Sequence, residues 1–194
     1  MSARPKTSDA GIRAVARKLL EEGGIDNLSM LAVADAVGVR APSLYKRFSS
    51  KSDLLLAVTG DTLLELQASV EKAVHPRSAY RSLERMAAAY RAFAKKNPRA
   101  YQLIFEDIPL SLDDRSDRDV RLAAAAALLR ILSEAMGEEK ALLGARTLVS
   151  FLHGFLSMEL NGLFRFGGDI NEAFRFGLST ILNALLGSGG RTRR

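Results

Sequence analysis

Apolar residues recur along this chain mostly at the three- and four-residue spacing of amphipathic helices, and no segment shows the alternation typical of a strand. In the first segment the apolar positions are Ile12, Val15, Ala16, Leu19 and Leu20. This spacing predicts a helix over 8–22, with Ser8 as its N-terminal cap and Gly23 after its end. Further helices are predicted over 30–37, 41–48, 50–74, 77–96, 99–106, 118–136, 139–165 and 170–186. The chain is therefore expected to be all-α, with about nine helices.

Residues 28–56 carry the most specific pattern, which is that of two short helices separated by a tight turn and followed by a third. Ser29 is suited to cap the first helix and Gly38 to end it, because glycine adopts the left-handed conformation without strain. The small residue Ala34 stands four positions before that glycine, and the apolar Leu44 stands six positions after it. This spacing lets two short helices cross closely at a steep angle, which is typical of a helix-turn-helix.

The outward face predicted for the second helix of this motif is basic and polar, as a DNA-binding face requires. The predicted DNA-binding residues are Ser29, Arg40, Ala41, Pro42, Ser43, Tyr45, Lys46, Arg47 and Lys51. Those expected to reach base edges are Arg40, Ser43 and Lys46. Those expected to hold phosphates are Tyr45, Arg47 and Lys51. The alternative is a plain helical hairpin with a solvated basic face, but the agreement of turn, core and polar positions favours DNA binding.

The string Leu44–Tyr45, Phe48, Lys51 and Leu54–Leu55 resembles the DNA-binding domain of the tetracycline-repressor (TetR) family of bacterial transcriptional regulators. The resemblance covers about residues 8–60. Members of the family usually have a histidine just before the aromatic residue, where this chain has Arg47. The resemblance implies binding to double-stranded operator DNA, a small-molecule effector of unknown identity, and repression rather than activation.

The formal net charge of +6 is unevenly distributed along the chain. Residues 1–51 hold nine Lys and Arg against five Asp and Glu, and three arginines stand in the last four residues. The segment between them is close to neutral, which is typical of a protein whose N-terminal domain meets phosphate. We therefore expect a DNA-binding domain over 1–52, a ligand-binding and dimerisation domain over 53–187, and a disordered basic tail over 188–194.

The last two predicted helices are apolar on more than one face, which places them either in a core or at a subunit interface. We expect them to form a four-helix bundle with a second copy of the chain. A homodimer would also present two recognition helices to two half-sites. The predicted interface residues are Phe155, Leu163, Phe174, Leu178, Ile181, Leu182 and Leu185. A monomer with a large core is the alternative.

The middle of the chain resembles one class of TetR C-terminal ligand-binding domains, named for a Trp, a His and a Gly. His153 and Gly154 match this class, but the chain contains no Trp. The predicted pocket residues are Met86, Tyr90, Phe93, Tyr101, Phe105, His153 and Met158. We expect Gly154 to leave space beside His153, although aromatic residues and a lone histidine at helical spacing also occur as ordinary core residues. Glu159 either pairs with an arginine or lines the interface or the cavity.

Composition excludes several other classes of protein. The chain has no Cys and only two His, which argues against disulfides, thiolate catalysis and a metal centre. It has neither a Gly-rich phosphate loop nor a serine elbow, so we expect no catalytic residues, no cofactor and no enzyme activity. No stretch reaches 18 uncharged apolar residues, so a cytoplasmic protein without a membrane partner is expected. The alternative function is that of a non-regulatory architectural DNA-binding protein, which would not need so long an apolar C-terminal part.

Overall fold

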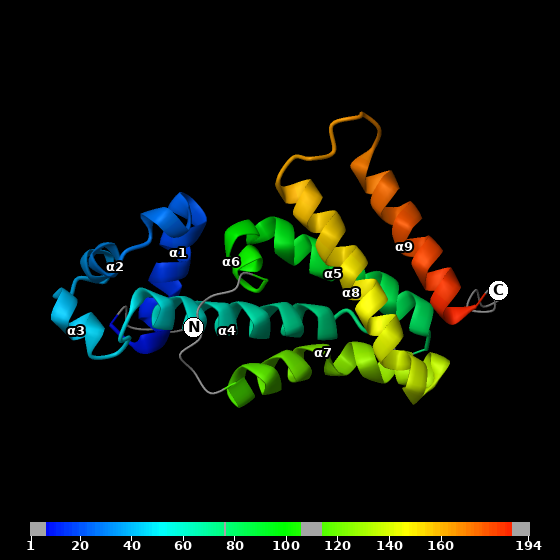
Figure 1. The fold of residues 1–194 in the computed structure, drawn as a ribbon, viewed down its shortest axis with the longest axis horizontal. Coiled ribbons are helices and arrows are strands. Elements are labelled where there is room, and N and C mark those ends of the chain that lie inside the picture. The colour runs from blue at the N-terminus through cyan, green and yellow to red at the C-terminus, as the bar shows by residue number, and fades with distance from the viewer. Residues whose placement is uncertain (1–6, 76, 106–113, 188–194) are drawn as a thin grey trace. The chain divides into compact units, whose positions relative to one another are not determined.

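The computed structural model describes residues 7–75, 77–105 and 114–187, with side chains from 125 onward in the last of these ranges. The described residues form nine helices and no strand, which confirms the all-α prediction (Figure 1). The helices are α1 (Asp9–Asn27), α2 (Met30–Val37), α3 (Ala41–Tyr45), α4 (Lys51–Glu71), α5 (Ala79–Lys96), α6 (Pro98–Leu103), α7 (Asp114–Met136), α8 (Glu138–Leu160) and α9 (Ile170–Leu186). The predicted basic tail over 188–194 and residues 106–113, between the predicted helices over 99–106 and 118–136, lie outside the described residues.

Several helix bounds differ from the prediction. The first helix is interrupted at Gly24, whose φ of 77° and ψ of −180° are non-helical, as the predicted end after residue 22 requires, but a further helical turn extends α1 to Asn27. The recognition helix is shorter than expected, because the backbone N–H groups of Arg47 and Phe48 both bond to the carbonyl of Leu44 in a tightened last turn. The eighth helix ends at Leu160 rather than at 165, since Gly162 adopts φ 63°. The seventh helix begins earlier than expected, at Asp114.

The chain divides into two compact units, and the described parts of each have their own core. Unit 1 comprises Met1–Leu64 and Asn97–Val120, and unit 2 comprises Glu65–Lys96 and Arg121–Arg194. The bounds of these two units differ from those of the predicted domains over 1–52 and 53–187. The predicted domain division stays a prediction. The difference arises because α6 packs with the N-terminal helices.

The core of unit 1 is formed by α1, α2, α3, the first part of α4, and α6. Its fully buried side chains include Ile12, Leu20, Val33, Ala34, Leu44, Leu54 and Ala100. The Glu21 carboxylate of α1 accepts hydrogen bonds from the backbone N–H groups of Arg99 (3.2 Å) and Ala100 (2.9 Å). In return, the Arg99 guanidinium donates to the carbonyls of Leu20 (3.3 Å) and Glu21 (3.1 Å). Each helix therefore satisfies unpaired backbone groups at one end of the other.

The core of unit 2 is formed by α5, α8 and α9 together with the C-terminal part of α7. Its buried side chains include Leu83, Met86, Leu132, Leu148, Leu152, Phe174 and Leu182. Figure 1 shows α8 and α9 side by side, running in opposite directions. They approach closely at Gly177, where an added Cβ would lie 2.6 Å from the Phe151 ring. The helix α8 is long and apolar enough to cross a bilayer, but its Leu148 and Leu152 face belongs to this core.

Candidate nucleic-acid interface and C-terminal cleft

The helix-turn-helix has the local geometry that its sequence predicts. The Ser29 hydroxyl accepts from the backbone N–H of Ala32 at 3.1 Å and so caps α2. Gly38 adopts the left-handed conformation, at φ 83° and ψ 33°, and its N–H donates to the carbonyl of Ala34. The side chains of Ala34 and Leu44 are fully buried where α2 and α3 meet. The motif therefore holds α3 rigidly against α2, with one face of α3 turned outward.

The outward face of α3 is mostly polar, and cationic residues flank it at both ends. The exposed residues among the predicted DNA-binding set are Ser29, Arg40, Pro42, Ser43, Tyr45, Lys46 and Arg47, whereas Ala41 and Lys51 are half-buried. Among the described residues, no carboxylate lies within ion-pair distance of Arg40 or Lys46. These two cations are therefore available to an anionic partner, while a DNA contact for each member of the set stays a prediction.

Two side chains expected to hold phosphates make hydrogen bonds within the chain instead. The Arg47 guanidinium donates to the Asp9 carboxylate of α1 at 2.7 Å, and the Lys51 ammonium donates to the carbonyl of Ile25 at 2.6 Å. Sequence reasoning missed Asp9 and Ile25, because they lie 38 and 26 positions from their partners and no local pattern links them.

The first half of α4 is anchored to the rest of unit 1 by short polar contacts. The Asp53 carboxylate accepts from the backbone N–H of Ser49 at 2.7 Å, and the Ser50 hydroxyl accepts from the N–H of Asp53 at 3.0 Å. Ser50 therefore caps the helix, and Asp53 in the first turn binds the backbone just before the cap. Further along, Arg13 of α1 pairs with Asp61 at 2.6 Å. This ion pair ties α4 to α1 within unit 1.

The seven predicted pocket residues are divided between the two units. Tyr101, which is fully buried, and Phe105 belong to unit 1, where their rings are tilted with centroids 5.4 Å apart. The other five belong to unit 2 and are Met86, Tyr90, Phe93, His153 and Met158. Burial lowers the pKa of His153 below its usual range, which favours the neutral imidazole. The space expected beside Gly154 is open surface, because this glycine is exposed and an added Cβ would meet no atom within 4 Å.

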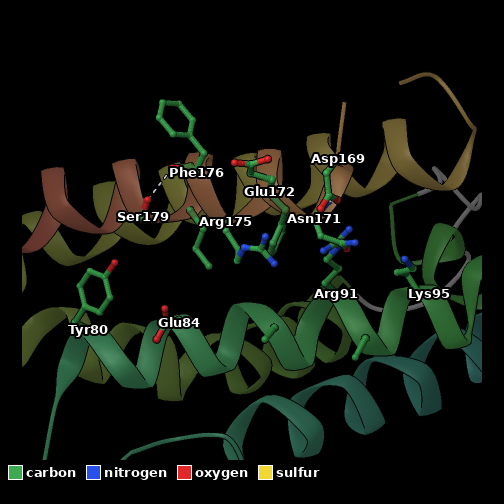
Figure 2. A pocket seen from close by; sticks show the side chains of 14 residues that line it. Tyr80, Glu84, Arg91, Lys95, Asp169, Asn171, Glu172, Arg175, Phe176 and Ser179 are labelled. Carbon is green, nitrogen blue, oxygen red and sulfur yellow. Dashed lines mark hydrogen bonds between the residues drawn. The ribbon is translucent and has the colours of Figure 1, made fainter. Parts of the chain in front are cut away.

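A cleft of about 940 Å³ lies in unit 2, between α5 and α9. Figure 2 shows Tyr80 and Glu84 reaching up from α5, Arg175 reaching down from α9, and Phe176 pointing away. The apolar lining residues are Ala88, Ala92, Phe174 and Leu178. The cleft is large enough for a small molecule, although it is open and its rim carries charges of both signs. None of the seven predicted pocket residues lines it.

A buried ion pair stands at one end of this cleft. Glu159 of α8 accepts two hydrogen bonds from the Arg91 guanidinium, at 2.8 and 2.6 Å, and one from Lys95 at 2.9 Å. The Arg91 guanidinium also lies 4.6 Å from the centre of the Phe174 ring. The hydrogen bond from Arg91 lowers the pKa of Glu159 below its usual range. The sequence left several roles open for Glu159, and the structure confirms one of them, which is pairing with an arginine.

The predicted dimer-interface residues differ in burial, and their role at an interface stays a prediction. Phe174, Leu178 and Leu182 are already buried within their own chain by the packing of α5, α8 and α9. The remaining predicted residues are the half-buried Phe155, Ile181 and Leu185 and the exposed Leu163. The apolar side chains left exposed on α8, on α9 and in the loop between them are Leu142, Leu143, Met158, Leu163, Phe166 and Phe176.

Comparison with known proteins indicates the same family for the N-terminal and the C-terminal part of the chain. A family model described as "Bacterial regulatory proteins, tetR family" matches residues 12–58, and one described as "Tetracyclin repressor-like, C-terminal domain" matches residues 83–181. An HTH-type transcriptional regulator of Mycobacterium tuberculosis, Rv0681, is 32% identical over 163 residues, which cover 83% of this chain and 74% of that protein.

Solved structures share the fold over nearly the whole chain. A protein of unknown function from Rhodococcus sp. RHA1 has a TM-score of 0.79 at 23% identity, covering 95% of this chain and all of that one. A variant of TetR from Acinetobacter baumannii AYE, in complex with minocycline, has a TM-score of 0.70 at 20% identity, covering 92% of this chain and 96% of that one.

Proposed function

The chain belongs to the TetR family of DNA-binding transcriptional regulators, and from this premise we propose that it is a repressor that a small molecule releases from its operator. Members of this family are regulators rather than enzymes. The observation that carries the proposal is the exposed polar face of α3, flanked by the exposed cations Arg40 and Lys46 and held on a buried helix-turn-helix core. Such a helix enters the major groove with its outward side chains toward the base edges.

Within this proposal, Arg40, Ser43 and Lys46 contact base edges, and Tyr45 contacts a phosphate. Arg40 precedes the first residue of α3, and Lys46 follows the last, so the set spans the whole exposed side of this short helix. Lysine and arginine pair with the acceptor edge of guanine, and hydroxyl groups pair with several bases. Within the described part of the chain, Arg40 and Lys46 have no carboxylate partner, and this assignment places both on DNA.

We propose a homodimer formed by the outward faces of α8 and α9. Phe176, Phe166 and Leu163 are 74%, 105% and 47% exposed, which is unusual for large apolar side chains so near one another in sequence. The exposed Gly154 in the middle of α8 supports this proposal, because glycine costs a helix up to about 1 kcal/mol, and among the described residues no atom lies within 4 Å of a Cβ added there. A second copy whose backbone passes close to this glycine would require it.

The effector proposal rests on the family and on the space available in unit 2. The TetR variant from Acinetobacter baumannii that shares this fold forms a complex with minocycline. In this chain the cleft between α5 and α9 has a suitable volume, and the set around His153 is the other candidate site. The effector in either place acts by favouring a state of the dimer in which the two α3 helices no longer fit two half-sites.

The test starts by selecting preferred sequences from a random pool of DNA duplexes, which yields an operator for binding assays. We expect a palindromic preference, as two copies of α3 require. Replacing Lys46 with Ala should weaken operator binding by roughly 1–3 kcal/mol and relax the preference at one base position. Lys18→Ala is the matched control, because Lys18 is an exposed lysine of α1 that pairs with Glu22, one turn away. A selection that yields no preferred sequence would favour the architectural alternative.

A further inference from the structure

One contact joins the start of α1 to the end of the helix-turn-helix. The guanidinium Nη1 of Arg47 lies 2.7 Å from the carboxylate Oδ1 of Asp9, and the two side chains are 44% and 60% exposed. Asp9 is placed by the beginning of α1, because the hydroxyl of the preceding Ser8 caps that helix by accepting from the N–H of Gly11. A carboxylate in the first turn is also favoured by the helix dipole. Asp9 is therefore held where Arg47 can reach it.

The ion pair changes what Arg47 can contribute to DNA binding. Affinity for a duplex of any sequence depends on how many phosphates the protein neutralises, because each neutralised phosphate releases counterions. Arg47 and Asp9 together carry no net charge, so the pair as a unit neutralises none. An exposed ion pair contributes little to stability, so Asp9 is not needed to hold the fold. Its carboxylate would, however, compete with a phosphate for the same guanidinium.

We propose that Asp9 is a specificity-determining residue, which withholds Arg47 from the phosphate backbone and thereby limits the attraction to DNA of arbitrary sequence. This inference rests on the proposed function, since it requires α3 to face DNA. Arg40 and Lys46 make no such pair among the described residues and serve base recognition. If the affinity for random DNA falls while the base contacts are kept, the ratio of operator affinity to random-DNA affinity rises. This ratio decides whether the operator is occupied in the presence of a large excess of non-operator sites.

The test compares full-length proteins on a labelled random-sequence duplex and on the selected operator, with fluorescence anisotropy over 0.05–0.2 M KCl. Asp9→Asn keeps the size and an acceptor oxygen but removes the charge. We expect it to tighten random-duplex binding by roughly three- to tenfold at 0.1 M salt, and to steepen the slope of log affinity against log salt by about 1. Operator binding should tighten by less than this, so the ratio of operator affinity to random-duplex affinity should fall, and an unchanged ratio would contradict the role of Asp9 in specificity.

Two further variants separate this role from a general effect of charge. In an Arg47→Gln background, Asp9→Asn should leave the salt slope unchanged, because there is no guanidinium to release. Asp26→Asn removes a charge at the other end of α1 and should change the slope much less than Asp9→Asn does. Thermal melting of each variant, expected to stay near the parent, shows that α1 is intact.

Three other results would also overturn the inference while leaving the proposed function standing. These are an unchanged slope for Asp9→Asn, weaker binding by that variant, and an equal effect of Asp9→Asn with and without Arg47. If the parent protein binds neither duplex at 0.05 M salt, the proposed function itself fails, and the inference fails with it.

Discussion

The ion pair between Arg91 and Glu159 should contribute strongly to the stability of unit 2, and Glu159→Gln tests this. The two side chains are only 12% and 9% exposed, so both charges are largely removed from water. Removing one partner of a buried pair costs about 3–5 kcal/mol, because the other charge stays buried without compensation. Here the glutamine leaves Arg91 stacked on the Phe174 ring with the cationic Lys95 nearby.

We expect a loss near the lower end of that range, about 3 kcal/mol, because Lys95 is 51% exposed and can turn toward water. For a chain of this length, such a loss lowers the melting temperature by roughly 6–12 °C. The measurement is urea and thermal unfolding followed by circular dichroism, at one fixed protomer concentration, since dimerisation would make the midpoint depend on it. Glu139→Gln, an exposed glutamate in the first turn of α8, is the matched control and should change stability little.

The pH dependence gives a second check on the same residue. The pKa of Glu159 is lowered in the folded protein, first by the hydrogen bond from Arg91, so the stabilisation is present above the unfolded value of 4.5. It is lost as the pH falls from that value through the lower folded pKa. The difference in stability between the parent and Glu159→Gln should therefore shrink below about pH 4.5. A loss no greater than that of Glu139→Gln at pH 7 would refute the reasoning, because it would mean that water already screens the pair.

Three further predictions concern unit 2. Gly177→Ala should lower stability by about 1–3 kcal/mol in unfolding experiments, since its Cβ would lie 2.6 Å from the Phe151 ring. Gly154→Ala should leave the protomer folded but weaken the dimer in sedimentation experiments. An unaffected dimer would contradict the proposed interface. His153→Phe should reduce the affinity for a ligand found by thermal shift, while leaving ligand-free operator binding near normal. If this variant binds the ligand as well as the parent does, His153 is a core residue.

The helix-turn-helix could be predicted in detail because its determinants are close together in the chain. Ser29 caps α2 through a residue three positions away, and Gly38 ends α2 through its own backbone conformation. The burial of Ala34 and Leu44 follows from the spacing of one short motif. Capping, turn geometry and helical periodicity are properties of a few neighbouring residues, so the sequence is enough to specify them.

The polar contacts that join helices could not be predicted, because their partners lie far apart in the chain. Arg47 meets Asp9 across 38 positions, and Arg91 meets Glu159 across 68. Each of these residues could equally have been a solvated surface charge. Which carboxylate meets which cation depends on how the helices pack, and no short-range pattern encodes that.

Which apolar side chains of the last two helices become buried could not be predicted either. Periodicity alone indicated that α8 and α9 have more apolar surface than one contact requires. It did not show that Phe174 and Leu182 are covered by the chain itself, nor that Phe176 stays exposed. The sequence by itself determined the helices, the motif and its basic face, since these depend on local spacing. Only the tertiary structure decided which apolar faces are used within the chain and which charges are paired, because burial depends on the neighbours that each face acquires.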